Sequence, residues 1–285
     1  MILAHAGHHG SIASAWEAPL AVLAGAAIAL ALFGQAFVRL RRRGRKDHAG
    51  WDRAALFALA VALGTLALVS PLDYIGEEYL LSAHMLQHVV IGDLAVALAV
   101  VALRGPLTFF LLPAVVLGRL AKLGWLRSGL RVLLDAKVAF VLWAVVIAAW
   151  HVPAAYDYAL THQVVHDLEH LSFVLVGTLV WIQLVDPARR RELGLTGKLA
   201  LAIALFAAGQ ILADVLIFAM RPLYPSYADQ PERLLGLSPL QDQRLAGLVM
   251  MGEQLLTLGT FVALLLIVQH RRLFRPSEDE RRVAA

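Results

Sequence analysis

The sequence contains no cysteine among its 285 residues, which excludes disulfides, thiolate metal sites and cysteine-based redox chemistry. Any site for a soft metal must therefore use histidine, methionine or carboxylate ligands. Charged residues are also scarce, at 16% of the chain, whereas about 25% is usual in globular domains. Lysine and arginine are absent ahead of the first apolar stretch, so we do not expect a removable signal peptide.

Apolar residues are correspondingly abundant and make up 60% of the chain. A run of about 20 apolar residues lets a helix cross roughly 30 Å of hydrocarbon, and such runs recur along the sequence. We therefore predict an all-α integral membrane protein, a bundle of seven transmembrane helices with membrane lipid as its main solvent. The predicted spans are residues 18–40, 54–69, 80–103, 138–151, 164–185, 199–220 and 245–269. Residues 106–134 are apolar but interrupted by Pro113 and basic residues, which predicts an interfacial amphipathic segment between the third and fourth spans.

The basic residues are divided unevenly between the loops that these spans define. Of the 25 lysines and arginines, 22 fall on one side and only Arg221, Arg233 and Arg244 on the other. Short basic loops stay in the cytoplasm, so we predict a multi-pass protein of the inner (plasma) membrane with an outside N-terminus and a cytoplasmic C-terminus. Since these residues act as topology signals, the net charge of +4 does not indicate a nucleic-acid partner. The predicted organisation is a flexible histidine-containing outer tail (1–17), a single seven-helix membrane domain (18–270) and a cytoplasmic tail (271–285).

Histidines concentrate on the outer side of this topology, which holds nine of the eleven. His84 and His88 open the third span, and His166 and His170 lie at the start of the fifth, each pair four residues apart and so on one helix face. Neutral imidazole suits copper and zinc, and two such pairs supply four nitrogen ligands. We predict that the two helices pack with these pairs facing each other as an outward-open copper site. The tail histidines, His5, His8 and His9, would capture metal.

Two further groups of residues have a structural and a functional interpretation. Asp93, Asp214 and Glu253 are acidic residues within apolar spans, where they act either as partners of a histidine site or as hydrogen-bonding groups between helices. Met85, Met250 and Met251 are either ligands for Cu(I) or packing residues. Isolated histidines, similarly, are tolerated as polar residues at helix ends near the membrane surface.

Four motifs together resemble the CtaG family of multi-span cytochrome c oxidase assembly factors, which is associated with the caa3-type oxidase. They are His84-Met85-Leu86-Gln87-His88, Trp150-His151-Val152-Pro153 followed by Tyr156-Asp157, His166-Asp167-Leu168-Glu169-His170, and Arg221-Pro222-Leu223-Tyr224-Pro225 leading to Asp242-Gln243-Arg244-Leu245-Ala246-Gly247. The resemblance covers roughly residues 50–270. It implies a non-enzymatic role in maturing a copper-containing oxidase, with copper handled at the outer face and an oxidase subunit as the acceptor. The residues it implies for the metal site are His84, His88, His151, His166, His170 and Asp242.

Alternative functions are a zinc metallopeptidase and a haem- or quinone-binding protein. His166-Asp167-Leu168-Glu169-His170 matches the H-x-x-E-H pattern, in which two histidines bind zinc and the glutamate is the base. A peptidase of this kind needs another carboxylate ligand downstream, and the fifth span has none after His170. Histidines from two helices can also ligate haem iron. A retinal protein is excluded because residues 245–269 contain no lysine for a Schiff base.

Overall fold

The computed structural model describes residues 12–190 and 192–273, and every regular element in this part of the chain is a helix. His5, His8 and His9 lie outside the described residues, as does most of the predicted cytoplasmic tail, so both tails stay predictions. The predicted all-α class is confirmed for the residues described.

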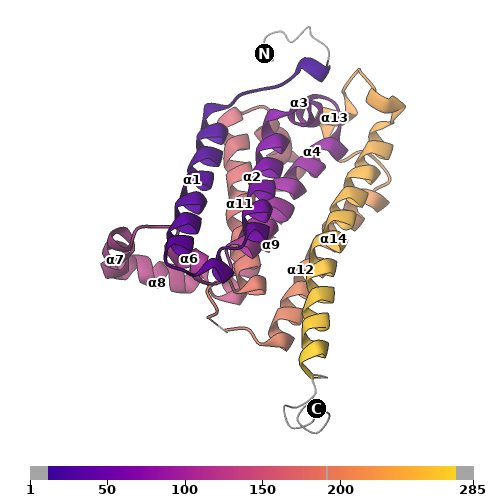
Figure 1. Cartoon of the computed structure of the whole chain (residues 1–285). Coiled ribbons are helices and arrows are strands. Elements are labelled where there is room, and N and C mark those ends of the chain that lie inside the picture. Colours follow the sequence, from indigo (N-terminus) through magenta and orange to yellow (C-terminus); the bar gives the residue numbers. More distant parts are fainter. Residues whose placement is uncertain (1–11, 191, 274–285) are drawn as a thin grey trace, which may run out of the picture.

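Long helices form the body of the molecule and run roughly side by side (Figure 1). Six are long and apolar enough to cross a membrane, as the predicted spans require: residues Leu20–Arg42, Lys46–Val69, Leu81–Ala102, Gln163–Val185, Leu195–Phe218 and Pro239–Arg271. They correspond to α1 (Leu20–Arg42), η2 (Lys46–His48) with α2 (Trp51–Val69), α4 (Leu81–Val89) to α5 (Ala95–Ala102), α11 (Gln163–Val185), α12 (Leu195–Phe218) and α14 (Pro239–Leu273). Large apolar side chains such as Val145, Leu175 and Ile211 remain exposed on the bundle, as expected for surfaces that face lipid.

The fourth predicted span, 138–151, differs from the others. It corresponds to α9 (Ala136–Trp150), whose 15 residues rise only about 22 Å and fall short of roughly 30 Å of hydrocarbon. Helix α8 (Gly124–Leu133) precedes it at a bend of 72°. The count is therefore six spans, or seven if α8 and α9 together form one bent span.

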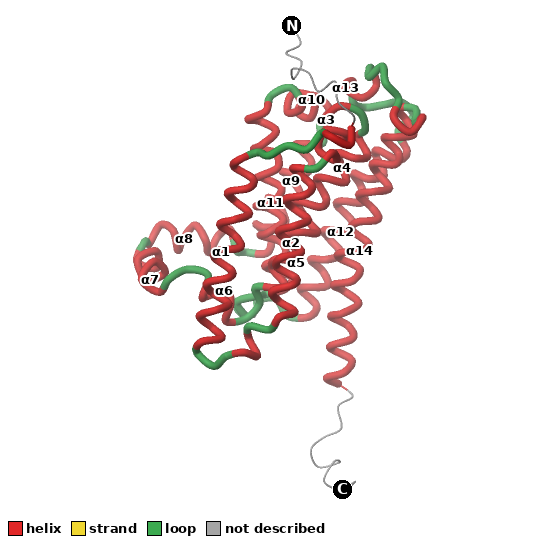
Figure 2. The backbone as a smooth tube through the Cα atoms, turned by 45° about the horizontal axis from the view of Figure 1, so that its top comes forward, coloured by secondary structure: helices red, strands yellow, loops and turns green. Residues whose placement is uncertain are grey.

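Residues 106–134, which were predicted as an interfacial segment, form three short helices. These are α6 (Pro106–Phe110), α7 (Ala114–Lys122) and α8. Figures 1 and 2 show α7 and α8 projecting from the side of the bundle, near the end where α1 finishes. Most of their residues are exposed, including Val115 and Trp125.

Short elements gather at the opposite end of the bundle, where α4, α11 and α14 begin. They include α3 (Pro71–Glu78), α10 (Pro153–Leu160) and α13 (Pro225–Ala228), which lie close together in Figure 2. The remaining short turns are η1 (Ile12–Ser14) and η4 (Leu234–Gly236). This end carries the histidine motifs.

A π-helical turn, η3 (Val90–Leu94), interrupts the third span between α4 and α5. Gly92 in this turn packs directly against Gly177 of α11, so closely that a β-carbon on Gly177 would overlap the Gly92 carbonyl oxygen. Turns of this kind are frequent at functional sites. The close approach of α11 to the third span brings the first turns of the two helices together.

Candidate metal centre

The two histidine pairs face each other across the contact between α4 and α11. Within each helix the rings lie one turn apart, with centroids separated by 4.2 Å for His84 and His88 and by 4.1 Å for His166 and His170. Between the helices, the centroids are 5.2 Å apart for His84 and His166 and 5.0 Å apart for His88 and His170. The predicted juxtaposition of the four side chains is therefore confirmed.

One nitrogen from each ring points toward a common centre. The Nε2 atoms of His84 and His166 are 3.2 Å apart, and those of His88 and His170 are 3.1 Å apart. All four potential ligand atoms lie within 4.8 Å of one another. A tetrahedral ion with metal–nitrogen bonds of about 2.0 Å separates its ligand atoms by about 3.3 Å. The four imidazoles therefore match the size of a tetrahedral metal site without large movements.

Two of these histidines, His84 and His166, have a partner at Nδ1, the ring nitrogen that does not face another histidine. His84 Nδ1 lies 2.9 Å from the Tyr227 hydroxyl, which itself donates to the Gly76 carbonyl at 2.7 Å. Since that hydroxyl proton is used, His84 Nδ1 is the donor and its Nε2 keeps a free lone pair. His166 Nδ1 similarly lies 2.9 Å from the Glu77 carboxylate. Partners of this kind fix the tautomer and orientation of a metal-binding histidine.

Glu169 supplies a buried carboxyl group beside His88. Its Oε1 atom lies 3.9 Å from His88 Nδ1, and neither atom has a hydrogen-bond partner. The glutamate side chain is only 2% exposed, so an unpartnered oxygen here is costly. A metal on His88 Nε2 would make Nδ1 a stronger donor toward this carboxylate.

The site is covered rather than outward-open as predicted. His84 is 1% exposed and His166 is 3% exposed, whereas His170 keeps part of its surface accessible. Glu77 of α3 and Tyr227 of α13 contact the ring nitrogens from the outer side. The short elements at this end of the bundle therefore lie over the histidines. The outward-open prediction was wrong because no local sequence pattern specifies how the short elements at this end fold over the histidines.

Asp242, which the resemblance implies for the metal site, lies in the first turn of α14. Its carboxylate accepts hydrogen bonds from the backbone N–H groups of Leu81 at 2.7 Å and Ser82 at 3.1 Å, and from the Ser82 hydroxyl at 2.5 Å. These are free donors at the start of α4. Asp242 is thus placed to hold the helix that carries His84 and His88, and the group of metal-ligand atoms formed by the four histidines does not include it.

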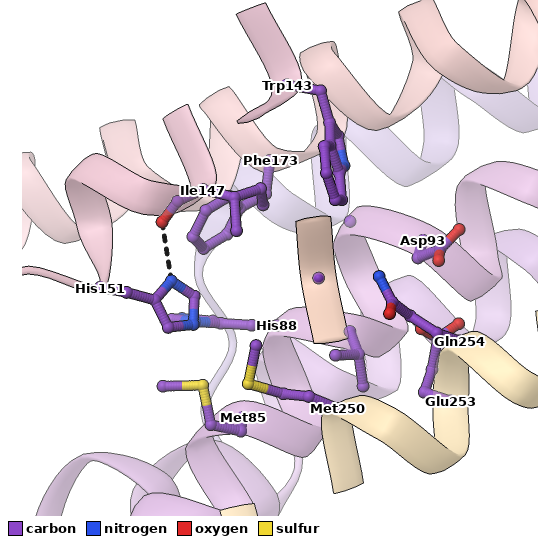
Figure 3. Close-up of a pocket in the computed structure, with 13 residues that line it drawn as sticks. Met85, His88, Asp93, Trp143, Ile147, His151, Phe173, Met250, Glu253 and Gln254 are labelled. Carbon is purple, nitrogen blue, oxygen red and sulfur yellow. Dashed lines mark hydrogen bonds between the residues drawn. The ribbon is translucent and has the colours of Figure 1, made fainter. Parts of the chain in front are cut away.

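His151, also predicted as a site residue, lies at the C-terminal end of α9. Its Nδ1 lies 2.7 Å from the Ile147 carbonyl, and its buried Nε2 has no partner. Figure 3 shows this ring beside Met85 and Met250, close to His88. All four side chains line a cavity of about 60 Å³. His151 therefore adjoins the four-histidine group without belonging to it.

Among the described residues, no hydrogen bond or ion pair joins the three intramembrane acids to the four histidines, although Asp93 and Glu253 line the same cavity as His88. Asp214 accepts a hydrogen bond from Gln210 at 2.7 Å. Asp93 and Glu253 lie within hydrogen-bonding reach of each other, and Asp93 also accepts from Trp181 and Thr257. In Figure 3 the Asp93 and Glu253 side chains are on the side of the cavity opposite His151. Hydrogen bonding therefore accounts for these acids better than support of the histidines does. Asp93 bonds to residues of α11 and α14, whereas the bond to Asp214 stays within α12.

A titratable group lies in the covering helix α3. Burial, together with the neighbouring Glu77 carboxylate, raises the pKa of Asp73 to about 7, against the opposing effect of a hydrogen bond from Gln87. Burial also raises the pKa of Tyr227 well above its ordinary value, so this residue stays a neutral phenol. Its hydroxyl remains available to both Gly76 and His84.

The family model for the cytochrome c oxidase caa3 assembly factor (Caa3_CtaG) matches residues 31–272. The chain belongs to the Caa3_CtaG family. The match contains all six of the predicted site residues and nearly all of the described membrane bundle. No curated protein and no solved structure matched the sequence. The resemblance drawn from the four motifs is thus confirmed, and the role in oxidase assembly is that of the family.

Glu77 and Tyr227 of this Caa3_CtaG chain were not predicted as site residues. Glu77 lies in a short helix that carries no histidine motif, and no local pattern indicates that it meets His166. Tyr227 follows the Arg221-to-Pro225 motif by two residues, which was the one available signal. Both residues come from short elements whose positions depend on how the chain folds at the end of the bundle that carries the histidines.

Proposed function

We propose that this Caa3_CtaG protein handles copper as cargo at the outer face of the membrane and delivers it to a cytochrome c oxidase subunit during maturation. The observation that carries the proposal is the convergence of four histidine nitrogens within 4.8 Å of one another. Imidazole ligands suit copper and zinc, and the family's association with a copper-containing oxidase favours copper.

The surroundings of the four histidines support a binding site rather than accidental packing. His84 and His166 are each held through Nδ1, which leaves Nε2 free for a metal. Glu77 and Glu169 supply carboxyl groups beside the site, and these would offset the charge of a bound ion. Because the histidines are covered, we infer that copper enters and leaves when α3 and α13 separate.

The composition of the site disfavours the alternative functions. Catalytic zinc sites keep a position open for water, whereas four histidines complete a tetrahedral shell. The H-x-x-E-H motif therefore supplies ligands here without an open position. A haem needs a macrocycle between its axial histidines, but the Nε2 atoms of His88 and His170 are only 3.1 Å apart. A small ion fits this space and a porphyrin does not.

The orientation that we propose places the histidines outside and the termini on opposite sides. The division of basic residues, 22 against 3, supports an outside N-terminus and a cytoplasmic C-terminus. Seven spans are needed for that orientation, so we propose that the bent pair of α8 and α9 provides the fourth crossing. In this arrangement α9 lies in the membrane, and α8, which carries Arg127 and Arg131, lies at the cytoplasmic interface beside α7. Reporter fusions after His48 and at the C-terminus would then both read cytoplasmic.

The experiment that tests the function combines copper binding with oxidase maturation. We expect the double variant His88→Ala/His166→Ala to lose stoichiometric copper binding, measured by elemental analysis after reconstitution, and to fail to support caa3-type oxidase in cells. Far-UV circular dichroism checks that the helical bundle remains. His162→Ala is the matched control, because this histidine precedes the same helix but is exposed and bonds to Tyr158. Full copper binding and oxidase activity in the double variant would contradict the proposal.

A further inference from the structure

A second pocket lies at the end of the bundle opposite the histidines. It is formed where α2 begins, α5 and α11 end and α12 begins, and its volume is about 850 Å³. Helix α11 joins the two sites, since its 23 residues span about 34 Å. The hydrogen bond from Gly105 N–H to the Pro187 carbonyl, at 2.6 Å, holds the ends of α5 and α11 together at this pocket.

Positive charge dominates the lining of this pocket. Four basic side chains and a single carboxylate line it, contributed by Arg53, Arg104, Arg189, Lys198 and Asp186. These cations come from four separate segments of the chain, so the fold, and not a run of basic sequence, gathers them. Arg53 lies close enough to Arg104 and Arg189 for their charges to repel, and Asp52, which does not line the pocket, offsets only part of this charge from an exposed position 3.9 Å from Arg104. Such a group is stabilised when an anion occupies the space between its members.

The backbone at the pocket supports the same preference for an anion. Helix α12, 24 residues long, begins beside it, and Gly194 at the N-cap has no side chain that would accept hydrogen bonds from the first N–H groups. Space around Gly194 is open. Asp186 and Arg189 adopt left-handed backbone conformations, with φ of 52° and 56°, and for arginine this is uncommon. The bent backbone brings Arg189 to the pocket instead of continuing α11.

We propose that this basic pocket binds a phosphate group, carried either by an anionic phospholipid at the membrane surface or as free phosphate. Arginine and lysine donors together with helix N–H groups are the usual ligands of phosphate in proteins. The volume of about 850 Å³ admits a lipid headgroup with part of its glycerol. Basic pockets between membrane helices on the cytoplasmic side bind headgroups of this kind.

The test uses the full-length protein purified in a neutral detergent. Native mass spectrometry would compare its retention of phosphatidylglycerol with that of phosphatidylcholine, and thermal unfolding would be followed with and without inorganic phosphate. We expect Arg189→Gln/Lys198→Gln to reduce phosphatidylglycerol retention on the order of tenfold. Retention of neither lipid, together with phosphate stabilisation lost in the same variant, would identify free phosphate as the ligand and also support the proposal.

Arg119→Gln/Lys122→Gln is the matched control, because it also removes one arginine and one lysine, but from exposed positions on α7. A second pair of variants guards against misfolding: Gly194→Asp caps α12 while repelling phosphate, whereas Gly194→Asn caps it without charge. The proposal predicts that Gly194→Asp abolishes binding and that Gly194→Asn retains more. It is overturned if wild type binds neither ligand, if the α7 control loses binding equally, or if Gly194→Asp binds as wild type does.

Discussion

Gly177 of α11 lies against the carbonyl oxygen of Gly92 in the π turn, with no room for a β-carbon between the two helices. The histidine pairs lie on the same two membrane spans, about one to three turns from this contact, toward the ends where α4 and α11 begin. The separation of the helix backbones at the glycine contact therefore sets the distance across the metal centre. Glycines contribute here by being small, as in other close contacts between membrane helices.

Gly177→Ala should consequently weaken copper binding although it changes no ligand. Overpacking of this kind costs about 1–3 kcal/mol, and the displaced helix would move His166 and His170 away from their partners. We expect at least a tenfold loss of copper affinity, measured by competition with a chelator. Gly259→Ala on α14 is the control, because no atom lies within 4 Å of its added β-carbon. Unchanged affinity in Gly177→Ala would show that the glycine contact does not set the site.

Tyr227→Phe tests the role of the hydroxyl that holds His84. Loss of a partner of a metal-binding histidine typically lowers metal affinity by about 10- to 100-fold. The variant should still bind one copper at saturation, with a stability cost of about 1–3 kcal/mol, because the buried Gly76 carbonyl and His84 Nδ1 lose their partner. Tyr79→Phe is the control, since that hydroxyl lies 3.4 Å from Tyr74 and does not contact the histidines. Equal affinity in both variants would contradict the assigned role.

Asp242→Asn distinguishes support of a helix from metal ligation. An asparagine oxygen still accepts hydrogen bonds from the start of α4, so we expect unchanged copper stoichiometry and a small loss of stability. Asp242→Ala leaves the buried Leu81 and Ser82 donors without their partner, at a cost of about 1–3 kcal/mol. Thermal unfolding and elemental analysis give the two readouts. Loss of copper in the folded Asn variant would restore Asp242 to the ligand set.

Asp73 should make stability depend on pH in the copper-free protein. Its pKa is raised from 3.8 to about 7, so folding favours the neutral carboxyl. The stabilisation is fully present below about pH 4 and is lost as the pH rises through about 7. Asp73→Asn should therefore match wild type near pH 4 and be more stable at pH 8, by on the order of 2–4 kcal/mol. A constant difference in unfolding temperature from pH 4 to 8 would refute this origin.

The histidine pairs were predictable because helix geometry alone fixes which residues share a face. His84 and His88 must align, as must His166 and His170, and both pairs begin their spans at one end. The roles of Asp242, Glu77 and Tyr227 were not predictable. Each meets its partner through contacts distant in sequence, such as Asp242 with Leu81, which no periodic pattern encodes.

The span boundaries were likewise predictable in part. Long apolar runs located six helices to within a few residues, apart from the longer starts at Lys46 and Pro239. The fourth run is the exception, since Asp135 caps α9 through the N–H groups of Lys137 and Val138 and the chain bends there. The cap at Asp135 fixes where α9 begins, and a hydropathy pattern does not reveal a cap of this kind.

X-ray absorption spectroscopy of the copper-loaded protein at equimolar copper tests the central claim most directly. The four-histidine site predicts a first shell of about four nitrogen atoms near 2.0 Å, with the outer-shell scattering of imidazole rings and without sulfur. His88→Ala/His166→Ala should lose that signal, whereas His162→Ala should keep it. A shell with sulfur near 2.3 Å would place copper instead beside Met85, Met250 and His151 in the adjoining cavity, and would contradict the four-histidine assignment.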